Sequence, residues 1–123
     1  MNIEIQQVAR DAAKKIERKA RTVKDINDVI SIGAVMDELK KSFPSTKLRG
    51  QYIQQNLPEL AELDSPFRSN SRWVYRTHIG KEDADILEVM GVRSFSELPY
   101  THPTVLRQRY RERKAALGNA VTE

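Results

Sequence analysis

Hydrophobic residues recur along most of the chain at the spacing of an α-helix. From residue 3 to residue 21 they return every three or four positions, with no proline or glycine between them, which predicts a first helix over 3–21. Its other side carries basic residues at helical spacing, namely Arg10, Lys14, Arg18 and Arg21. The sequence therefore predicts a basic N-terminal helix.

Two further helices joined by a tight turn are predicted over residues 25–57. Thr22 or Asp25 can cap the first of them, and Pro44 ends it near Phe43, because proline disfavours helical geometry in the residue before it. Ser45 and Thr46 then supply capping side chains for a helix over 46–56. The side chains expected to face the core are Ile26, Val29, Ile30, Gly33, Met36, Leu39, Phe43, Leu48, Tyr52 and Leu57.

The middle of the chain has weaker patterns. Pro58 begins a short helix in PELAEL, whereas residues 64–71, rich in Ser, Asp, Asn and Pro, predict a flexible loop. The segment RWVYR near 72–76 leaves two structures open. Its aromatic and β-branched residues favour an irregular or extended segment, but Ser71 as a cap and two arginines one turn apart favour a helix, which we prefer.

The C-terminal third predicts a helical hairpin over 81–117. Acidic residues in the first turns and Gly91 after the last predict a helix over 81–90 that buries Ile86, Leu87 and Met90. Ser94 and Glu97 then have the spacing of a capping box. Thr101 or His102 caps a last helix, with Pro103 at its first position, Leu117 near its end and Gly118 stopping it before a flexible tail over 118–123.

The sum of these elements predicts one all-α domain over 1–123, a compact bundle of five or six short helices. A length of 123 residues, with 39% hydrophobic and 31% charged residues, fits a single globular core. The chain has no cysteine, which excludes disulfides and thiolate chemistry. The opening residues lack the apolar run of a signal peptide or membrane span, so we expect a cytoplasmic protein with no membrane partner.

Candidate catalytic chemistry is sparse. His78 and His102 have no further His or Cys at metal-ligand spacing, and no glycine-rich phosphate loop occurs. Asp83, Asp85 and Glu88 lie where acids stabilise the start of a helix, and two of them point in different directions around it. We therefore expect no enzyme activity, no metal and no cofactor.

The distribution of charge is more informative than the formal net charge of +4. Residues 1–24 and 105–117 are mainly basic, and acidic blocks lie between them, around Asp37 and around Asp83. This pattern predicts segregated positive and negative surfaces, which suit a charged partner and also suit pairing between helices of the same chain.

The unit over 25–57 combines an inward apolar side with outward hydrogen-bonding side chains, as a helix that reads the major groove must. It resembles the helix-turn-helix regulators carried by phages and plasmids, and the resemblance covers about a quarter of the chain. It implies transcription regulation through DNA contacts by Arg and Gln side chains, which can pair with guanine and adenine edges. The candidate contacts in and beside this unit are Lys40, Lys41, Thr46, Lys47, Arg49, Gln51, Gln54 and Gln55.

Two further basic surfaces are candidates for phosphate contacts. One consists of Arg68, Arg72 and Arg76 around Trp73, whose ring we expect inside the core. The other is the face of the last helix that carries Arg107, Arg111 and Lys114. The predicted function is binding of nucleic acid, above all duplex DNA, as a regulatory or accessory protein. The alternatives are a protein-binding adaptor or inhibitor that docks a host or assembly partner, and a structural subunit.

Overall fold

The structure is a computed structural model that describes residues 7, 10, 11 and 26–122. The predicted helix over 3–21 and the cap residues Thr22 and Asp25 lie outside this part, apart from the three isolated positions. The described residues form helices without any strand, which confirms the all-α prediction. The helices are α2 (Ile26–Ser42), α3 (Thr46–Asn56), α4 (Pro58–Ala61), α5 (Ser65–Val74), the π-helical turn η1 (Tyr75–Ile79), α6 (Ile86–Met90), the 3-10 turn η2 (Phe95–Glu97) and α7 (Pro103–Thr122).

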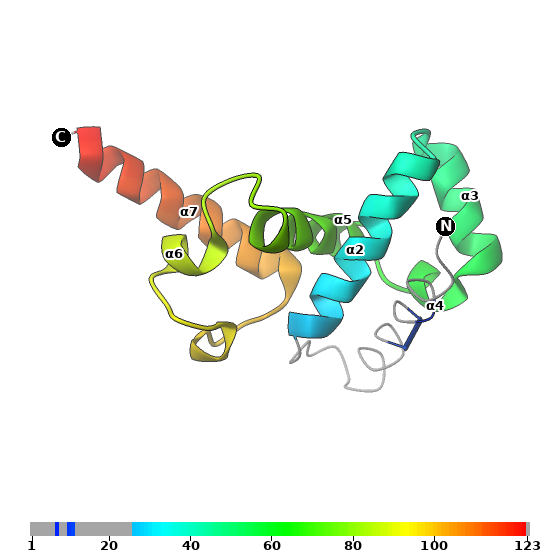
Figure 1. Ribbon diagram of the computed structural model, residues 1–123, viewed down its shortest axis with the longest axis horizontal. Helices are drawn as coiled ribbons and strands as arrows, with labels where there is room; N and C mark the ends of the chain where they lie inside the picture. The colour runs from blue at the N-terminus through cyan, green and yellow to red at the C-terminus, as the bar shows by residue number, and fades with distance from the viewer. Residues whose placement is uncertain (1–6, 8–9, 12–25, 123) are drawn as a thin grey trace.

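The centre of the molecule is the crossing of α2 and α5 (Figure 1). At this crossing, a Cβ atom added to Gly33 would lie 2.1 Å from the carbonyl oxygen of Ser71 and 2.7 Å from the Cβ of Tyr75. Only glycine lets the two backbones approach this closely. Gly33 is buried, as the sequence predicted, and it sets the distance between the two central helices.

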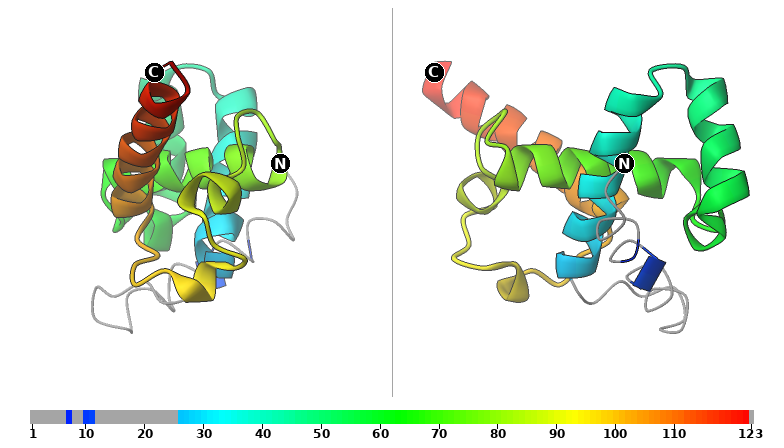
Figure 2. Two further views of the ribbon diagram at one scale, coloured as in Figure 1. Left: turned by 90° about the vertical axis from the view of Figure 1, so that its left-hand side faces the viewer. Right: turned by 45° about the vertical axis from the view of Figure 1, so that its right-hand side comes forward.

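One cluster of buried apolar side chains joins the helices from α2 to α7. Its members with no exposed surface are Val29, Ile32, Val35, Leu39, Leu57, Val74, Ile86 and Leu106. The last helix reaches this core only through its first half, and residues 111–118 are all exposed. The helix therefore extends away from the body of the molecule (Figures 1 and 2).

Helix α3 has the predicted bounds but presents a different apolar side chain to the core. Ser45 caps it by accepting a bond from the backbone nitrogen of Leu48 at 3.4 Å. Leu48, expected inside, is 55% exposed, while Ile53 is only 3% exposed. The two positions are five residues apart, about 140° around a helix, so they cannot face the same side. Arg10, from the predicted first helix, donates to the carbonyl oxygen of Asn56 at the end of α3.

The prediction of a flexible loop over 64–71 is wrong, because Asp64 caps α5 and the residues after it form the beginning of that helix. Asp64 caps this helix by accepting a bond from the backbone nitrogen of Phe67 at 2.7 Å, and Pro66 lies in the first turn, where a missing N–H costs nothing. The turn-forming composition therefore marks the beginning of a helix. The helical interpretation of 72–76 is confirmed, since α5 continues to Val74 and directly into η1.

The predicted helix over 81–90 begins five residues late, at Ile86. Asp85 caps it by accepting a bond from the backbone nitrogen of Leu87 at 3.2 Å, and Lys81 has a positive φ of 55°, which interrupts a helix. The other end is as predicted, since Gly91 adopts the left-handed conformation with φ 70°. Ile86 is buried, while Leu87 and Met90 are half-buried. The capping box formed by Ser94 and Glu97 is also confirmed.

The last helix begins at Pro103 as predicted but does not stop at Gly118. It continues to Thr122, so the expected tail over 118–123 is helical up to that residue. Glycine within an exposed helix costs about 1 kcal/mol relative to alanine, which is too little to end a helix when nothing turns the chain.

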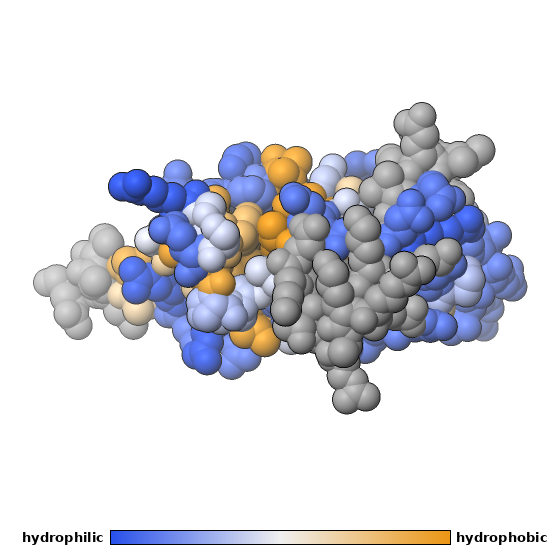
Figure 3. Space-filling model, turned by 90° about the horizontal axis from the view of Figure 1, so that it is seen from below, coloured by the Kyte–Doolittle hydropathy of each residue, from blue (hydrophilic) through white to orange (hydrophobic). Residues whose placement is uncertain are grey.

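Seen from below, apolar side chains gather in the middle of the molecule, and the end formed by α3 and α4 is polar (Figure 3). None of the described helices has the length and apolar character needed to cross a membrane.

Candidate nucleic-acid interface

Three adjoining hollows run across the molecule from α3 to α7. The largest, about 580 Å³, lies between the end of α2, α5 and α7, and we call it the α5–α7 pocket. The second, about 240 Å³, lies between α2, α3 and α5, and the third, about 370 Å³, lies against α3. Neighbouring hollows share lining residues: the first two share Lys40, Ser69 and Arg72, and the last two share Gly50, Ile53 and Arg68. The three hollows therefore adjoin one another, and we call them together the basic groove.

The groove collects nearly all of the side chains that the sequence marked as candidates. Of these fourteen residues, Lys41 alone lies outside it; Lys41 forms ion pairs with Asp37 at 3.4 Å and Glu38 at 3.7 Å. The thirteen that line the groove are Lys40, Thr46, Lys47, Arg49, Gln51, Gln54, Gln55, Arg68, Arg72, Arg76, Arg107, Arg111 and Lys114. Sequence positions far apart are thereby brought to one surface, with α3 and α7 at its two ends (Figure 1).

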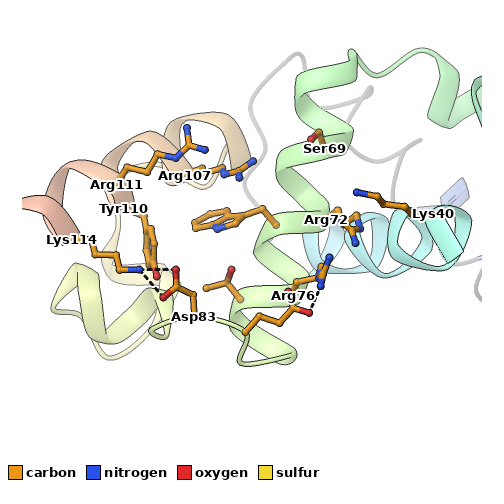
Figure 4. Close-up of a pocket in the computed structure, with 12 residues that line it drawn as sticks. Lys40, Ser69, Arg72, Arg76, Asp83, Arg107, Tyr110, Arg111 and Lys114 are labelled. Atoms are coloured by element: carbon orange, nitrogen blue, oxygen red, sulfur yellow. Dashed lines mark hydrogen bonds and ion pairs between the residues drawn. The ribbon is translucent and has the colours of Figure 1, made fainter. Parts of the chain in front are cut away.

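The lining of the groove is strongly basic. In the described part of the chain, nine Lys and Arg side chains line it, against the two carboxylates of Glu82 and Asp83. Six of the nine surround the α5–α7 pocket (Figure 4). Because the formal net charge of the whole chain is only +4, this surface concentrates positive charge and should attract polyanions.

Some of the basic side chains of this groove pair with carboxylates of the same chain, which is the second use of the charge pattern that the sequence left open. Arg72 Nε lies 3.1 Å from Asp37 Oδ1, and Lys114 Nζ lies 2.6 Å from Asp83 Oδ1. Arg76 pairs with Glu82 in the same way. The cause is the crossing of the helices, which brings the acidic residues of α2 and of the 81–85 segment against the basic faces of α5 and α7. Three groove cations are thus partly neutralised within the chain.

These ion pairs change the ionisation of their members. The hydrogen bond from Lys114 is the main reason that the pKa of Asp83 is lowered, and the same bond raises the pKa of Lys114. The hydrogen bond to Glu82 likewise raises the pKa of Arg76. Each charge therefore persists over a wider pH range than in the unfolded chain.

Two other groove arginines mainly hold the backbone in place. Arg49 donates to the carbonyl oxygen of Phe43 at 2.8 Å, at the turn between α2 and α3. Arg68 donates to the carbonyl oxygens of Leu60 at 3.1 Å and Leu63 at 2.7 Å, near the end of α4. Burial lowers the pKa of Arg68, partly offset by the charge of Asp64. We infer that both side chains have a structural role in addition to any contact with a ligand.

The remaining side chains of the groove are available to a ligand. Within the described residues, Lys40, Lys47 and Arg111 form no hydrogen bond or ion pair, and neither do Gln51, Gln54 and Gln55. Burial lowers the pKa of Arg107, and the positive charge of Arg111, one helical turn away, lowers it further. Like charges at this spacing repel each other, so an anion bound beside them would relieve the repulsion.

Trp73 was expected inside the core; it packs against the core and also lines the α5–α7 pocket. It is half-buried, and its ring packs edge-on against Tyr110 with the ring centroids 5.0 Å apart. The guanidinium carbon of Arg107 lies over the indole at 5.6 Å from its centroid. Arg107 in turn donates to Asn70 Oδ1 at 3.0 Å, which fixes its position. The indole therefore contacts the core with one part and the pocket with another.

Sequence reasoning missed four residues that build this pocket. Ser69 and Thr77 line it, and Asn70 holds Arg107. Tyr110 lines it and donates to the carbonyl oxygen of Ala84 at 2.7 Å, which ties the 81–85 segment to α7. Only Tyr110 had a local signal, since it follows Leu106 by one helical turn and extends the apolar stripe of the last helix.

No grouping of three or more His, Asp or Glu side chains suited to a metal ion occurs in the described ranges. The arrangement offers positive charge, amide donors and acceptors, and one aromatic wall. In the comparisons with known proteins, no family model matches the chain, and no curated protein and no solved structure matches it either.

Proposed function

We propose that this protein binds nucleic acid, in particular duplex DNA, through the basic groove, and acts as a small regulatory or accessory protein. One observation carries the proposal: nine cationic side chains and only two carboxylates line a single groove across the molecule. A polyanion in the groove would release counterions from its phosphates, and this release drives association at low salt.

The two ends of the groove suit different contacts. The exposed face of α3 carries Lys47, Gln51, Gln54 and Gln55, whose polar ends have no competing partner among the described residues. Amide side chains of this kind read base edges. Lys40 in the middle of the groove and Arg111 at its other end offer charge without a fixed hydrogen-bonding direction, which suits phosphates. We assign base contacts to α3 and backbone contacts to α2 and α7.

The alternative function, a protein-binding adaptor, depended on segregated charged surfaces. The ion pairs of Arg72 and Lys114 with Asp37 and Asp83 interrupt that segregation, so it has less support than nucleic-acid binding. Tight capture of a protein partner that persists at high salt, with no binding to nucleic acid, would favour the adaptor instead.

A salt titration tests the proposal. Fluorescence anisotropy would measure the affinity for labelled random duplex DNA, single-stranded DNA and RNA at several salt concentrations. We expect duplex DNA to bind tightest and the logarithm of its association constant to fall linearly with the logarithm of salt, with a slope of about −0.9 per phosphate contact.

A matched pair of variants on α7 distinguishes the effect of a charge in the groove from the effect of the protein's overall charge. Arg111 lines the groove, whereas Arg109 is exposed on the same helix outside the groove and pairs with Glu112 at 3.2 Å. Arg111→Ala should weaken binding to all duplexes and make the slope shallower by about 1, and Arg109→Ala should change neither quantity. Salt-independent binding, or equal losses from both variants, would contradict the proposal.

A further inference from the structure

We infer that the α5–α7 pocket receives one unpaired nucleotide of a bound nucleic acid, with its base against Trp73 and Arg107 and its phosphate beside Arg111. The inference rests on the proposed function and names a more specific ligand for one part of the same groove. It starts from the difference between this pocket and the other two hollows, since Trp73 and Tyr110 line this one and no aromatic side chain lines the others.

The pocket is larger than a phosphate requires. Its volume of about 580 Å³ exceeds the 240 Å³ and 370 Å³ of its neighbours. It falls within the range of about 300 to 1,000 Å³ that is typical of sites for small organic ligands. A groove that contacts only the DNA backbone needs exposed charges along its surface and no hollow of this size.

The aromatic wall is held in a defined position. The indole of Trp73 packs on Tyr110 on one side, and the guanidinium of Arg107 lies over it at 5.6 Å from the ring centroid. Asn70 fixes Arg107 by accepting its hydrogen bond at 3.0 Å. Indole rings and guanidinium planes are the two protein surfaces on which unstacked bases stack. The wall is therefore ordered before any ligand arrives, which reduces the entropy lost on binding.

The charged side chains are distributed unevenly around the pocket. Arg111 and Lys114 lie on the α7 side of the pocket, and Lys40 and Arg72 lie on the opposite side (Figure 4). Asp83 lies beside Lys114, and Glu82 pairs with Arg76. Carboxylates repel a phosphate, but their oxygens accept hydrogen bonds from amino groups and sugar hydroxyls. A nucleotide carries a phosphate at one end and such donors at the other. The charges therefore favour one orientation, with the phosphate beside the unpaired Arg111 and away from Asp83.

A base stacked inside a duplex can enter this pocket only by leaving the stack and losing its pairing, which costs free energy. A base that is already unpaired avoids this cost. The expected ligand is therefore a nucleotide without a partner, next to a duplex that occupies the rest of the groove.

Trp73 makes the test direct, because it is the one tryptophan in the chain and its emission reports on this pocket alone. Three labelled DNAs would be compared: a perfect duplex, the same duplex with one bulged nucleotide, and that duplex with an abasic sugar at the bulge. Anisotropy measures binding, and indole emission measures occupation of the pocket. We expect the bulged base to quench Trp73 and to bind about tenfold tighter than the abasic control, which keeps the phosphate but lacks the base.

A pair of serine variants tests the location. Ser69 is exposed on α5 and lines the pocket, whereas Ser42 is exposed at the end of α2 and lines none of the three hollows. Ser69→Leu should narrow the pocket without touching the core, and so reduce both the quenching and the tenfold preference. Ser42→Leu should keep both.

The outcomes separate the two proposals. Equal affinity for the bulged and abasic DNAs without quenching, together with salt-dependent binding of the perfect duplex, would overturn the pocket assignment and leave the proposed function standing. Retention of the preference in Ser69→Leu would also overturn the assignment. A failure of all three DNAs to bind would overturn both proposals.

Discussion

Arg72 on α5 donates from Nε to Oδ1 of Asp37 on α2 at 3.1 Å, across the crossing of the two central helices. Both side chains are largely removed from solvent, with exposed fractions of 21% and 12%. Arg76 and Lys41 also approach the same carboxylate, at 3.9 Å and 3.4 Å. Asp37 therefore links α2 to α5 and, at the same time, neutralises charge at the edge of the basic groove.

Replacing Asp37 should change stability and binding in opposite directions. Asp37→Asn leaves Arg72 without its ionic partner, so we expect the free energy of unfolding to fall by about 1 to 3 kcal/mol. The groove gains one unit of positive charge, so DNA should bind more tightly and with a steeper salt dependence. Urea denaturation and anisotropy measure the two effects.

The control for this prediction is Glu38→Gln on the same helix. Glu38 is 43% exposed and lies 3.7 Å from Lys41, so this change should alter stability by less than about 0.5 kcal/mol. A loss of stability of the same size in both variants would show that the position of Asp37 at the helix crossing is not special.

The outer face of α3 should determine sequence preference. Changing Lys47, Gln51 and Gln54 to alanine removes three exposed side chains without touching the core, so folding should be unaffected. Affinity for a preferred sequence should fall to that for random duplex, whereas random binding should weaken only by the contribution of one charge. Arg49 is left in place because it holds the turn after α2.

Competition between selected and random duplexes measures this preference. Lys41→Ala is the matched control, because Lys41 is exposed near the same turn but lies outside the groove. A triple variant that discriminates between sequences as well as the unaltered protein does would remove α3 from the site.

Gly33 and Gly50 should respond oppositely to the same substitution. A Cβ at Gly33 would lie 2.1 Å from the carbonyl oxygen of Ser71, so Gly33→Ala must push α2 and α5 apart and should cost about 1 to 3 kcal/mol or more. A Cβ at Gly50 meets nothing within 4 Å, so Gly50→Ala should stabilise α3 by up to about 1 kcal/mol. Thermal denaturation of both variants tests this, and a tolerated Gly33→Ala would contradict the close crossing.

His102 should make stability depend on pH. Its Nδ1 accepts a bond from the backbone nitrogen of Thr104 at 3.3 Å, and its ring packs edge-on against Phe67 at 5.1 Å. Burial lowers the pKa of His102, with a smaller opposing effect from Asp64. The unfolded chain therefore takes up this proton first as the pH falls, so stability should be greatest above a pH of about 6.5, the unfolded pKa, and decline below it.

Melting temperatures between about pH 8 and pH 5.5 measure this dependence. His102→Asn keeps a side-chain acceptor at the beginning of α7 but cannot be protonated, so the decline should become smaller in this variant. An identical pH profile in both proteins would show that His102 does not contribute.

Local signals in the sequence were sufficient to predict several helix boundaries. The bounds of α3, the left-handed Gly91 and the capping box of Ser94 and Glu97 depend on residues only a few positions apart, and the structure confirms them. The charge pattern also selected most of the residues that line the groove, because residue type alone identifies candidates for contact with a polyanion. Periodicity and capping act within one or two helical turns, so they can be inferred without knowing the tertiary structure.

Long-range contacts decided what these patterns left open. Ile53 replaces Leu48 in the core because the rest of the bundle covers that side of α3. Helix α6 begins at Ile86 rather than at Lys81 because η1 and the loop after it turn the chain there. The pairing of Arg72 with Asp37 needs the close crossing at Gly33. The sequence by itself therefore determined the helices and the chemical character of the groove. Tertiary packing decided which charges remain unpaired and which side chains surround one pocket, because both depend on distances between residues far apart in the chain.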